Sequence, residues 1–157
     1  MRACLDGGRA VGLLTSAKEP VVIPPERSDR QYVRCLEWLA SIDATPGFDL
    51  LALLTSQHGR FRRDASVVVI TEAGHADLPA YLASLRLRRV YADVALVDGS
   101  SFGGRGTMDE QLEALASSLV RAHVLRYGED VGEALRTPML DDTLSPLGRI
   151  SNEQLVG

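Results

Sequence analysis

SVVVITE (residues 66–72) places four consecutive apolar residues between a serine and the polar pair Thr71–Glu72. A short, continuous apolar run rich in β-branched residues predicts a strand that is covered on both faces, as in a parallel sheet. Thr71 and Glu72 then lie at the carboxyl end of this strand, just before a turn through Gly74. A carboxylate in that position either faces a metal ion or substrate, or is an ordinary strand end that meets water.

Strand and helix patterns alternate along the rest of the chain. Apolar runs predict the strands, and helical periodicity with capping residues such as Ser28 and Thr45–Pro46 predicts the helices. This alternation predicts an α/β fold with right-handed crossovers and a mostly parallel sheet. The strands are expected at 9–16, 20–26, 66–71, 89–99 and 123–128, and the helices at 28–42, 46–58, 77–88, 107–120 and 129–135.

The length and composition predict one domain of ordinary size. The chain has 157 residues, of which 45% are hydrophobic and 24% charged, and this composition is typical of a globular protein. Residues 1–136 are expected to form the domain. Residues 137–157 carry two prolines and no sustained periodicity, so they are expected to form a loose C-terminal tail.

The net charge, the length of the apolar runs and the cysteine spacing disfavour several functional classes. The net charge of −4 argues against a nucleic-acid binder. No apolar run approaches the ~20 residues of a membrane span, and no signal peptide follows Met1, so a soluble, cytoplasmic protein is expected. Cys4 and Cys35 have no metal-binding or redox spacing and are expected to be idle or buried thiols.

The predicted sheet has chemically different edges. Ligands of such sheets gather outside the carboxyl ends of the strands, where Thr71, Glu72 and Asp98 are expected. The opposite edge is basic, although solvated loops that happen to share a sign explain this equally well. The arginines that precede strands are Arg60, Arg62, Arg63, Arg86, Arg88 and Arg89.

Apart from Thr71 and Glu72, the main candidate for ligand binding is the loop DGSSFGGRG (98–106). Its glycines favour backbone N–H contacts to a phosphate, but the spacing of a phosphate-binding motif is missing, so a flexible connection is favoured. Asp98 and Ser100 also begin an Asp-x-Ser-x-Ser cation motif, but Phe102 occupies its third position. A polar turn is therefore the preferred interpretation.

No set of residues predicts catalysis. The three histidines are scattered, and only His75, three residues after Glu72, is expected near the ligand edge. No serine has the setting of a nucleophile elbow. The residues therefore favour a protein that is not an enzyme.

The order of the segments resembles one known family. AVGLLTS, VVIPPERS, RQYVRCLEWLASI, TPGFDLLALL, SVVVITE, VALVDGSSFGG and HVLRYGEDVGEAL together look like the C-terminal, von Willebrand factor A-like half of a bacterial domain-of-unknown-function-58 protein. The resemblance covers nearly all of residues 3–136. It implies a three-layer, Rossmann-like α/β domain with helices on both faces of the sheet and a 3-2-1-4-5-6 strand order.

The resemblance also implies a degenerate metal site. Von Willebrand A domains often bind a divalent cation through an Asp-x-Ser-x-Ser motif, a threonine and an aspartate. Thr45 stands at the position of the threonine, and Glu72 replaces the aspartate with a longer side chain. The first strand and its motif are absent, so Thr45 and Glu72 are expected to be a vestigial Mg²⁺ site, and no cofactor is expected.

The absent first strand would lie at the centre of the family's sheet. The strands at 10–15 and 66–71 are then expected to be parallel nearest neighbours, or to flank a gap. Their unpaired ladder groups would make the domain marginally stable and prone to self-association or to recruiting a strand.

The leading functional expectation is a non-enzymatic protein–protein interaction module. The resemblance implies a bacterial adaptor or assembly factor that works with a MoxR-type AAA+ ATPase. The alternative is a small nucleotide- or phosphate-binding α/β enzyme that uses the 98–106 loop.

Overall fold

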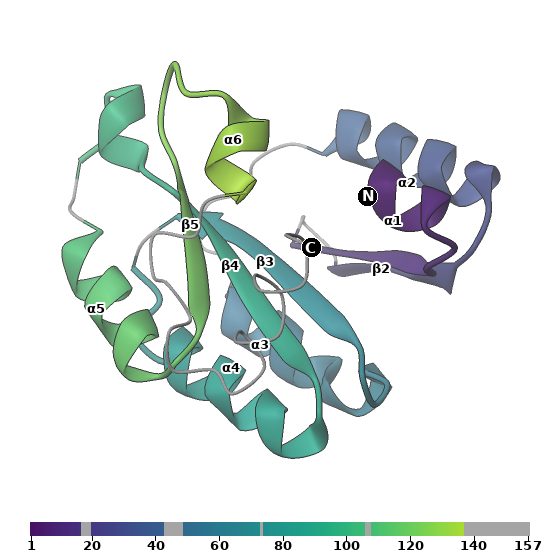
Figure 1. Cartoon of the computed structure of the whole chain (residues 1–157), viewed down its shortest axis with the longest axis horizontal. Helices are drawn as coiled ribbons and strands as arrows, with labels where there is room; N and C mark the ends of the chain where they lie inside the picture. The colour runs from purple at the N-terminus through teal and green to yellow at the C-terminus, as the bar shows by residue number, and fades with distance from the viewer. Residues whose placement is uncertain (17–19, 43–48, 73, 106–107, 137–157) are drawn as a thin grey trace, which may run out of the picture. The chain divides into compact units, whose positions relative to one another are not determined.

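The structure is a computed structural model that describes residues 1–16, 20–42, 49–72, 74–105 and 108–136. It divides into two compact units, Met1–His58 and Gly59–Gly157, and each is described by itself (Figure 1). The predicted tail at 137–157 lies outside the described residues. Within the described ranges, every helix is too short or too polar to span a bilayer.

The first unit is built on an antiparallel β-hairpin. Its strands pair with Leu14 opposite Val22, and a bulge interrupts the register between Val11 and Leu13. The helix that begins after Ser28 is closely tied to this hairpin. The elements are α1 (Arg2–Asp6), β1 (Val11–Ser16), β2 (Pro20–Glu26), α2 (Asp29–Ser41) and α3 (Leu50–Ser56).

The start of α2 confirms the predicted capping residue. The Ser28 hydroxyl accepts a hydrogen bond from the Gln31 N–H at 3.1 Å, which satisfies one of the free donors of the first helical turn. The Gln31 side chain is buried, and its amide nitrogen donates to the carbonyl oxygens of Val11 at 2.9 Å and Pro24 at 2.7 Å. One side chain therefore joins α2 to both strands.

The start of α3 corrects the predicted helix at 46–58. The helix begins at Leu50, and the Asp49 carboxylate caps it by accepting from Leu51 N–H at 2.9 Å and Ala52 N–H at 3.1 Å. Among the described residues the helix therefore starts at Leu50, because the Asp49 carboxylate satisfies the first donors of its first turn. Thr45, the predicted cap, lies outside the described residues.

The second unit confirms the parallel α/β arrangement. Its sheet has the order β3-β4-β5 with both pairs parallel, and Figure 1 shows β4 between the other two strands. The 3₁₀ turns 86–88 and 99–102 follow α4 and β4. The main elements are β3 (Ser66–Glu72), α4 (Leu78–Leu85), β4 (Tyr91–Val97), α5 (Asp109–Ser117), β5 (Arg121–Leu125) and α6 (Val131–Arg136).

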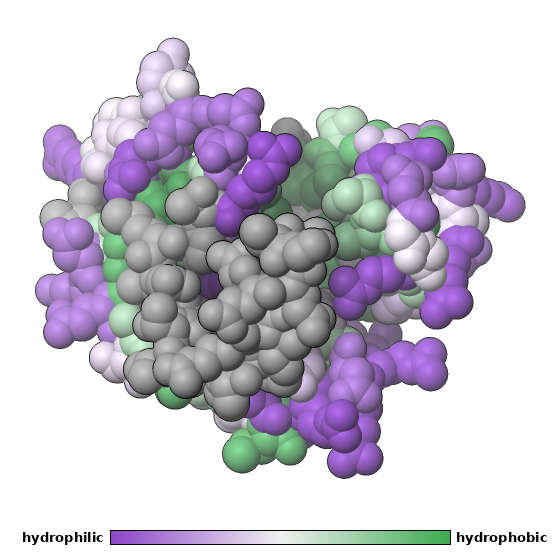
Figure 2. All heavy atoms as spheres, viewed as in Figure 1, coloured by the Kyte–Doolittle hydropathy of each residue, from purple (hydrophilic) through white to green (hydrophobic). Residues whose placement is uncertain are grey.

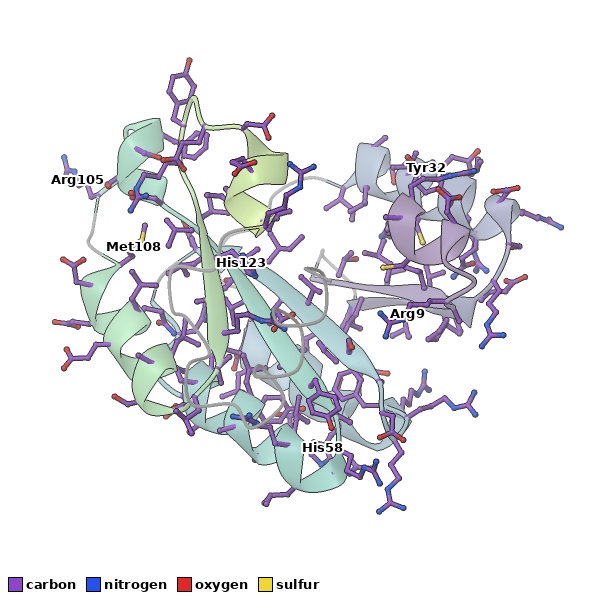
Figure 3. The ribbon with its side chains drawn as sticks, viewed as in Figure 1. Arg9, Tyr32, His58, Arg105, Met108 and His123 are labelled. Atoms are coloured by element: carbon purple, nitrogen blue, oxygen red, sulfur yellow. The ribbon has the colours of Figure 1, made fainter. Side chains whose placement is uncertain are left out.

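Helices lie on both faces of this sheet. The crossovers through α4 and α5 run in the same direction across the sheet, so right-handed connections put both helices on one face. Side chains alternate between the faces along β5, so His123 points away from its neighbours Ala122 and Val124. The His123 ring lies 3.3 Å from the Ala134 carbonyl of α6, which places α6 on the second face (Figure 3).

The predicted pairing of the strands at 10–15 and 66–71 is not found. In the described residues, β1 pairs with β2 and β3 pairs with β4, so the two strands belong to different sheets. Strand β1 forms its backbone hydrogen bonds with β2, the next strand in the chain. The short connection between them closes a hairpin with little loss of chain entropy. The alternative arrangement, in which the two strands flank a gap, stays a prediction.

The end of α5 also differs from the prediction. The helix stops at Ser117 instead of continuing to 120, because Leu119 adopts a left-handed conformation with φ 53°. Val120 N–H then bonds to the Leu115 carbonyl at 2.9 Å and closes the helix. Strand β5 begins at once at Arg121, two residues earlier than predicted.

Candidate functional site

Glu72 lies at the carboxyl edge of the parallel sheet, as predicted. It ends β3 opposite Val97, the last residue of β4. Its Oε2 atom would be 3.6 Å from a Cβ atom built on Gly99, so the carboxylate lies beside the turn that follows β4. The register of the sheet therefore brings Glu72 and the 98–104 turn together.

The turn after β4 is organised around Asp98. One oxygen of its carboxylate accepts the Ser100 hydroxyl at 2.6 Å and the Ser100 N–H at 3.1 Å. The Ser101 hydroxyl donates to the Asp98 carbonyl at 2.7 Å and accepts from Tyr127 N–H at 2.9 Å. Ser100 thus closes the turn on Asp98, and Ser101 fastens the turn to the loop after β5, which accounts for both serines without a cation.

Three backbone donors of this turn are used inside it. The N–H groups of Ser101, Gly103 and Gly104 donate to the carbonyls of Asp98, Ser100 and Gly99, at 3.0, 3.1 and 2.8 Å. A phosphate cradle requires such groups to point outward, toward the ligand. The described part of the 98–106 loop therefore favours the polar turn over the phosphate site.

The pKa of Asp98 is held below its ordinary value of 3.8. The main cause is the hydrogen bond from the Ser100 hydroxyl, with further contributions from the backbone N–H groups of Ser101 and Ser100 and from the positive charge of Arg126. Arg126 Nε lies 3.4 Å from Asp98 Oδ2.

This lowered pKa predicts a pH-dependent contribution to stability. A carboxylate with a depressed folded-state pKa stabilises the fold above its unfolded pKa, and the contribution is lost as the pH falls through the lower folded value. We expect Asp98→Asn to be less stable than the parent chain near pH 7, with the difference closing as the pH falls below the ordinary carboxyl pKa and through the lowered one. Urea unfolding across this range measures it. Asp77→Asn is the control, because Asp77 makes no capping hydrogen bond; a difference at Asp98 that does not change with pH would contradict the account.

The predicted metal residues are not brought together by the described structure. Thr45 lies outside the described residues, so the pair Thr45–Glu72 is not observed. In the described ranges there is no group of three or more histidine, cysteine, aspartate or glutamate side chains placed to hold a metal ion. Glu72 is exposed and offers one carboxylate.

We expect the chain to bind Mg²⁺ and Mn²⁺ poorly. Magnesium requires near-octahedral coordination and releases its waters reluctantly, and Thr45 and Glu72 would supply few of the ligands. Calorimetric titration should detect no sub-micromolar site. A tight site that Glu72→Ala abolishes would contradict this expectation.

Gln111 is a site residue that the sequence does not reveal. Its side-chain oxygen accepts from His75 N–H, and its side-chain nitrogen donates to the His75 carbonyl, each at 3.2 Å. Gln111 is buried on α5, so this clasp holds the loop after β3 against the helix. His75 is therefore engaged through its backbone. No period or motif marks a glutamine for such a role.

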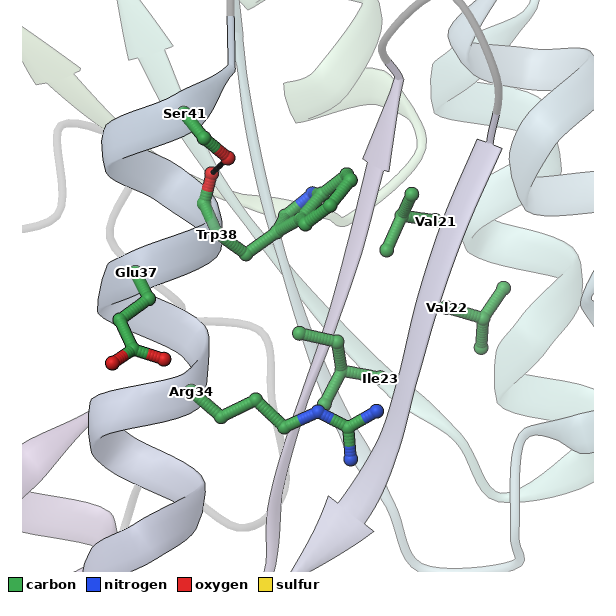
Figure 4. Close-up of a pocket in the computed structure, with 7 residues that line it drawn as sticks. All are labelled: Val21, Val22, Ile23, Arg34, Glu37, Trp38 and Ser41. Carbon is green, nitrogen blue, oxygen red and sulfur yellow. Dashed lines mark hydrogen bonds between the residues drawn. The ribbon is translucent and has the colours of Figure 1, made fainter.

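The first unit contains a shallow groove of about 420 Å³ between α2 and β2 (Figure 4). Val21, Ile23 and the Trp38 ring form its apolar part, and Arg34 and Glu37 add charge. The Trp38 indole N–H donates to the Thr15 hydroxyl at 3.2 Å, so the ring is tied to the hairpin. No buried polar group in the described residues points to a particular ligand for this groove.

The outer edge of β3 is a surface of the second unit that lies beside two exposed apolar side chains. In the described residues, β3 pairs only with β4, so its other edge has no strand. Val68 and Ile70 are 62% and 70% exposed, although they lie in the strand that the sequence predicts to be covered on both faces. The face of the molecule drawn in Figure 2 also shows hydrophobic residues at the surface among hydrophilic ones.

The backbone of β3 shows which residues face this open edge. The Ala65 carbonyl accepts from Tyr91 N–H at 2.9 Å and therefore points toward β4. Backbone groups of successive residues alternate between the two edges of a strand, so Val67, Val69 and Thr71 also face β4. The residues whose N–H and C=O groups face the open edge are Ser66, Val68, Ile70 and Glu72.

Comparison with protein-family models, with curated proteins and with solved structures finds no match to this chain. The fold class that the structure itself defines is a mixed α/β arrangement with a three-stranded parallel sheet flanked by helices, which is compatible with a Rossmann-like fold.

Proposed function

We propose that this chain is a protein–protein interaction module whose binding surface is the open edge of β3. The proposed mode is β-augmentation, in which a strand of the partner pairs with the edge through main-chain hydrogen bonds. Exposed side chains of the edge strand then select the partner.

One observation carries this proposal: an unpaired parallel strand with two exposed apolar side chains. Most edge strands are protected by charged residues, prolines or bulges. Strand β2 has Pro20, Pro24 and Pro25, whereas β3 has no proline and no charge between Ser66 and Glu72. An unprotected apolar edge of this kind pairs readily with another chain.

The chemistry at the carboxyl edge supports a binding module over an enzyme. Asp98, Ser100 and Ser101 are engaged with one another and with the neighbouring loop. The alternative, a nucleotide- or phosphate-binding enzyme that uses residues 98–106, gains no support from the described part of that loop.

The von Willebrand A-like resemblance proposes a more specific role. In that role the chain is a cytoplasmic bacterial adaptor or assembly factor for a MoxR-type AAA+ ATPase. The parallel β3-β4-β5 order is compatible with the second half of such a sheet. A MoxR-type ATPase of the same organism should then form a complex with the chain that Ile70→Lys disrupts.

A strand-forming peptide tests the proposed function directly. The first strand of the resembled family suggests a peptide of about six apolar residues followed by Asp-x-Ser-x-Ser, which matches the usual length of a strand. We expect it to raise the midpoint of thermal unfolding. We also expect Ile70→Lys to weaken its binding at least tenfold, because a charged side chain would replace the apolar one that packs beside the side chains of the added strand.

Leu87→Lys is the matched control for this experiment. Leu87 is 89% exposed and lies in the 3₁₀ turn 86–88, outside β3. A peptide with a central proline should not bind, because proline removes a ladder donor. No binding by the first peptide, or equal effects of the two lysine substitutions, would refute the proposed function.

A further inference from the structure

We propose that a second copy of this chain occupies the open edge, through antiparallel pairing of β3 with β3 about a twofold axis at Val69. This inference rests on the proposed function, because it assumes that the β3 edge binds a strand. It names the occupant and the register, so it can fail while the proposed function holds.

The backbone of β3 permits this pairing. The groups that face the open edge belong to Ser66, Val68, Ile70 and Glu72, as the contact between Ala65 and Tyr91 shows. With Val69 on the axis, Val68 meets Ile70 of the second copy, and Ser66 meets its Glu72. Every pair then joins residues whose N–H and C=O groups point toward each other, as an antiparallel ladder requires.

The side chains of β3 are also self-complementary in this register. Val68 and Ile70 project from the same face of the strand, and both are exposed. In the dimer they would stand directly opposite Ile70 and Val68 of the second copy and form one continuous apolar patch. Cross-strand pairs of β-branched residues are favourable. Shifting the axis to residue 68 or 70 would leave part of the strand unpaired.

The charges at the two ends of β3 complement each other. Arg62 and Arg63 are exposed just before the strand, where the Asp64 carboxylate is paired with Arg89 at 3.1 Å, and Glu72 and Asp77 are exposed at its end and just beyond. Antiparallel pairing brings the basic end of one strand beside the acidic end of the other. A parallel arrangement would instead place like charges together. The dimer should therefore weaken as salt is added.

The same geometry predicts a modest affinity. A single seven-residue strand offers less area than the ~800 Å² per partner of a standard stable interface. We therefore expect a reversible equilibrium between monomer and dimer, with a dissociation constant of about micromolar or weaker. A surface of this strength is suited to exchange between a second copy and another strand-donating partner.

A charge-pair experiment tests both the occupant and the register. Sedimentation velocity of the full chain over a concentration series should show dimer formation, and Val68→Lys or Ile70→Glu alone should weaken it at least tenfold. Mixing the two variants should restore association as a heterodimer, because the introduced ammonium would lie opposite the introduced carboxylate. Val68→Lys mixed with Leu87→Glu is the control: the Leu87→Glu chains should self-associate like the parent chain, because Leu87 lies outside β3, and the Val68→Lys chains should stay monomeric.

The outcomes separate this inference from the proposed function. A chain that is monomeric throughout the series, but binds the strand-forming peptide, would overturn the inference and leave the proposed function standing. A dimer that neither substitution weakens would also overturn it. The rescue by mixing guards against misfolding, since an unfolded variant would not regain association with its counterpart.

Discussion

Replacing Leu96 by alanine should lower the free energy of unfolding by about 2–5 kcal/mol, the range for removing a fully buried leucine. Leu96 lies in β4, the middle strand of the sheet, and its side chain is completely buried. Both neighbouring strands and the covering helices restrict how far the surroundings can close the cavity. Since domains are stable by only about 5–15 kcal/mol, this loss would be a large fraction of the total.

Urea unfolding followed by circular dichroism measures the effect, and Leu87→Ala is the matched control. Leu87 is 89% exposed, so the same change in chemistry should alter stability by no more than about 0.5 kcal/mol. Equal losses at the two positions would mean that β4 is not at the centre of a packed core.

Gly12→Ala should destabilise the first unit by about 1–3 kcal/mol, the range for forcing extra volume into a packed site. A Cβ atom on Gly12 would lie 2.7 Å from the Ile23 carbonyl oxygen and 3.0 Å from the Pro25 backbone nitrogen. These are backbone atoms of β2, and the bulge at Gly12 fixes their position. Relief would require the hairpin itself to shift.

Gly59→Ala is the control for this prediction. A Cβ atom there would meet nothing within 4 Å, and Gly59 has no positive φ. Alanine at residue 59 should therefore leave thermal unfolding nearly unchanged, whereas alanine at residue 12 should lower its midpoint clearly. The description of the bulge fails if both variants unfold like the parent chain.

Local patterns predicted much of this fold because they depend on neighbouring residues. The apolar run at 66–72 forms β3, and Ser28 caps α2 as expected. The parallel sheet follows from the alternation of strands with helices. Thr45 was a plausible cap by its chemistry, but Asp49 stands closer to the apolar residues of α3 and caps that helix instead.

Features that depend on distant contacts could not be predicted in the same way. Gln31 and Gln111 are buried because each satisfies backbone groups of another segment, and the sequence does not show those partners. The continuous apolar pattern of β3 predicted cover on both faces. The exposure of Val68 and Ile70 contradicts that cover within the described residues, and this mismatch locates the proposed binding edge.

Residue-resolved amide hydrogen exchange at several protein concentrations tests the open edge most directly. We predict that the N–H groups of Val67 and Val69, which face β4, are protected at every concentration. Those of Val68 and Ile70 should exchange quickly in dilute solution and become protected as the concentration rises or the strand-forming peptide is added. Protection of Val68 and Ile70 at every dilution, or fast exchange that neither concentration nor peptide slows, would contradict the account.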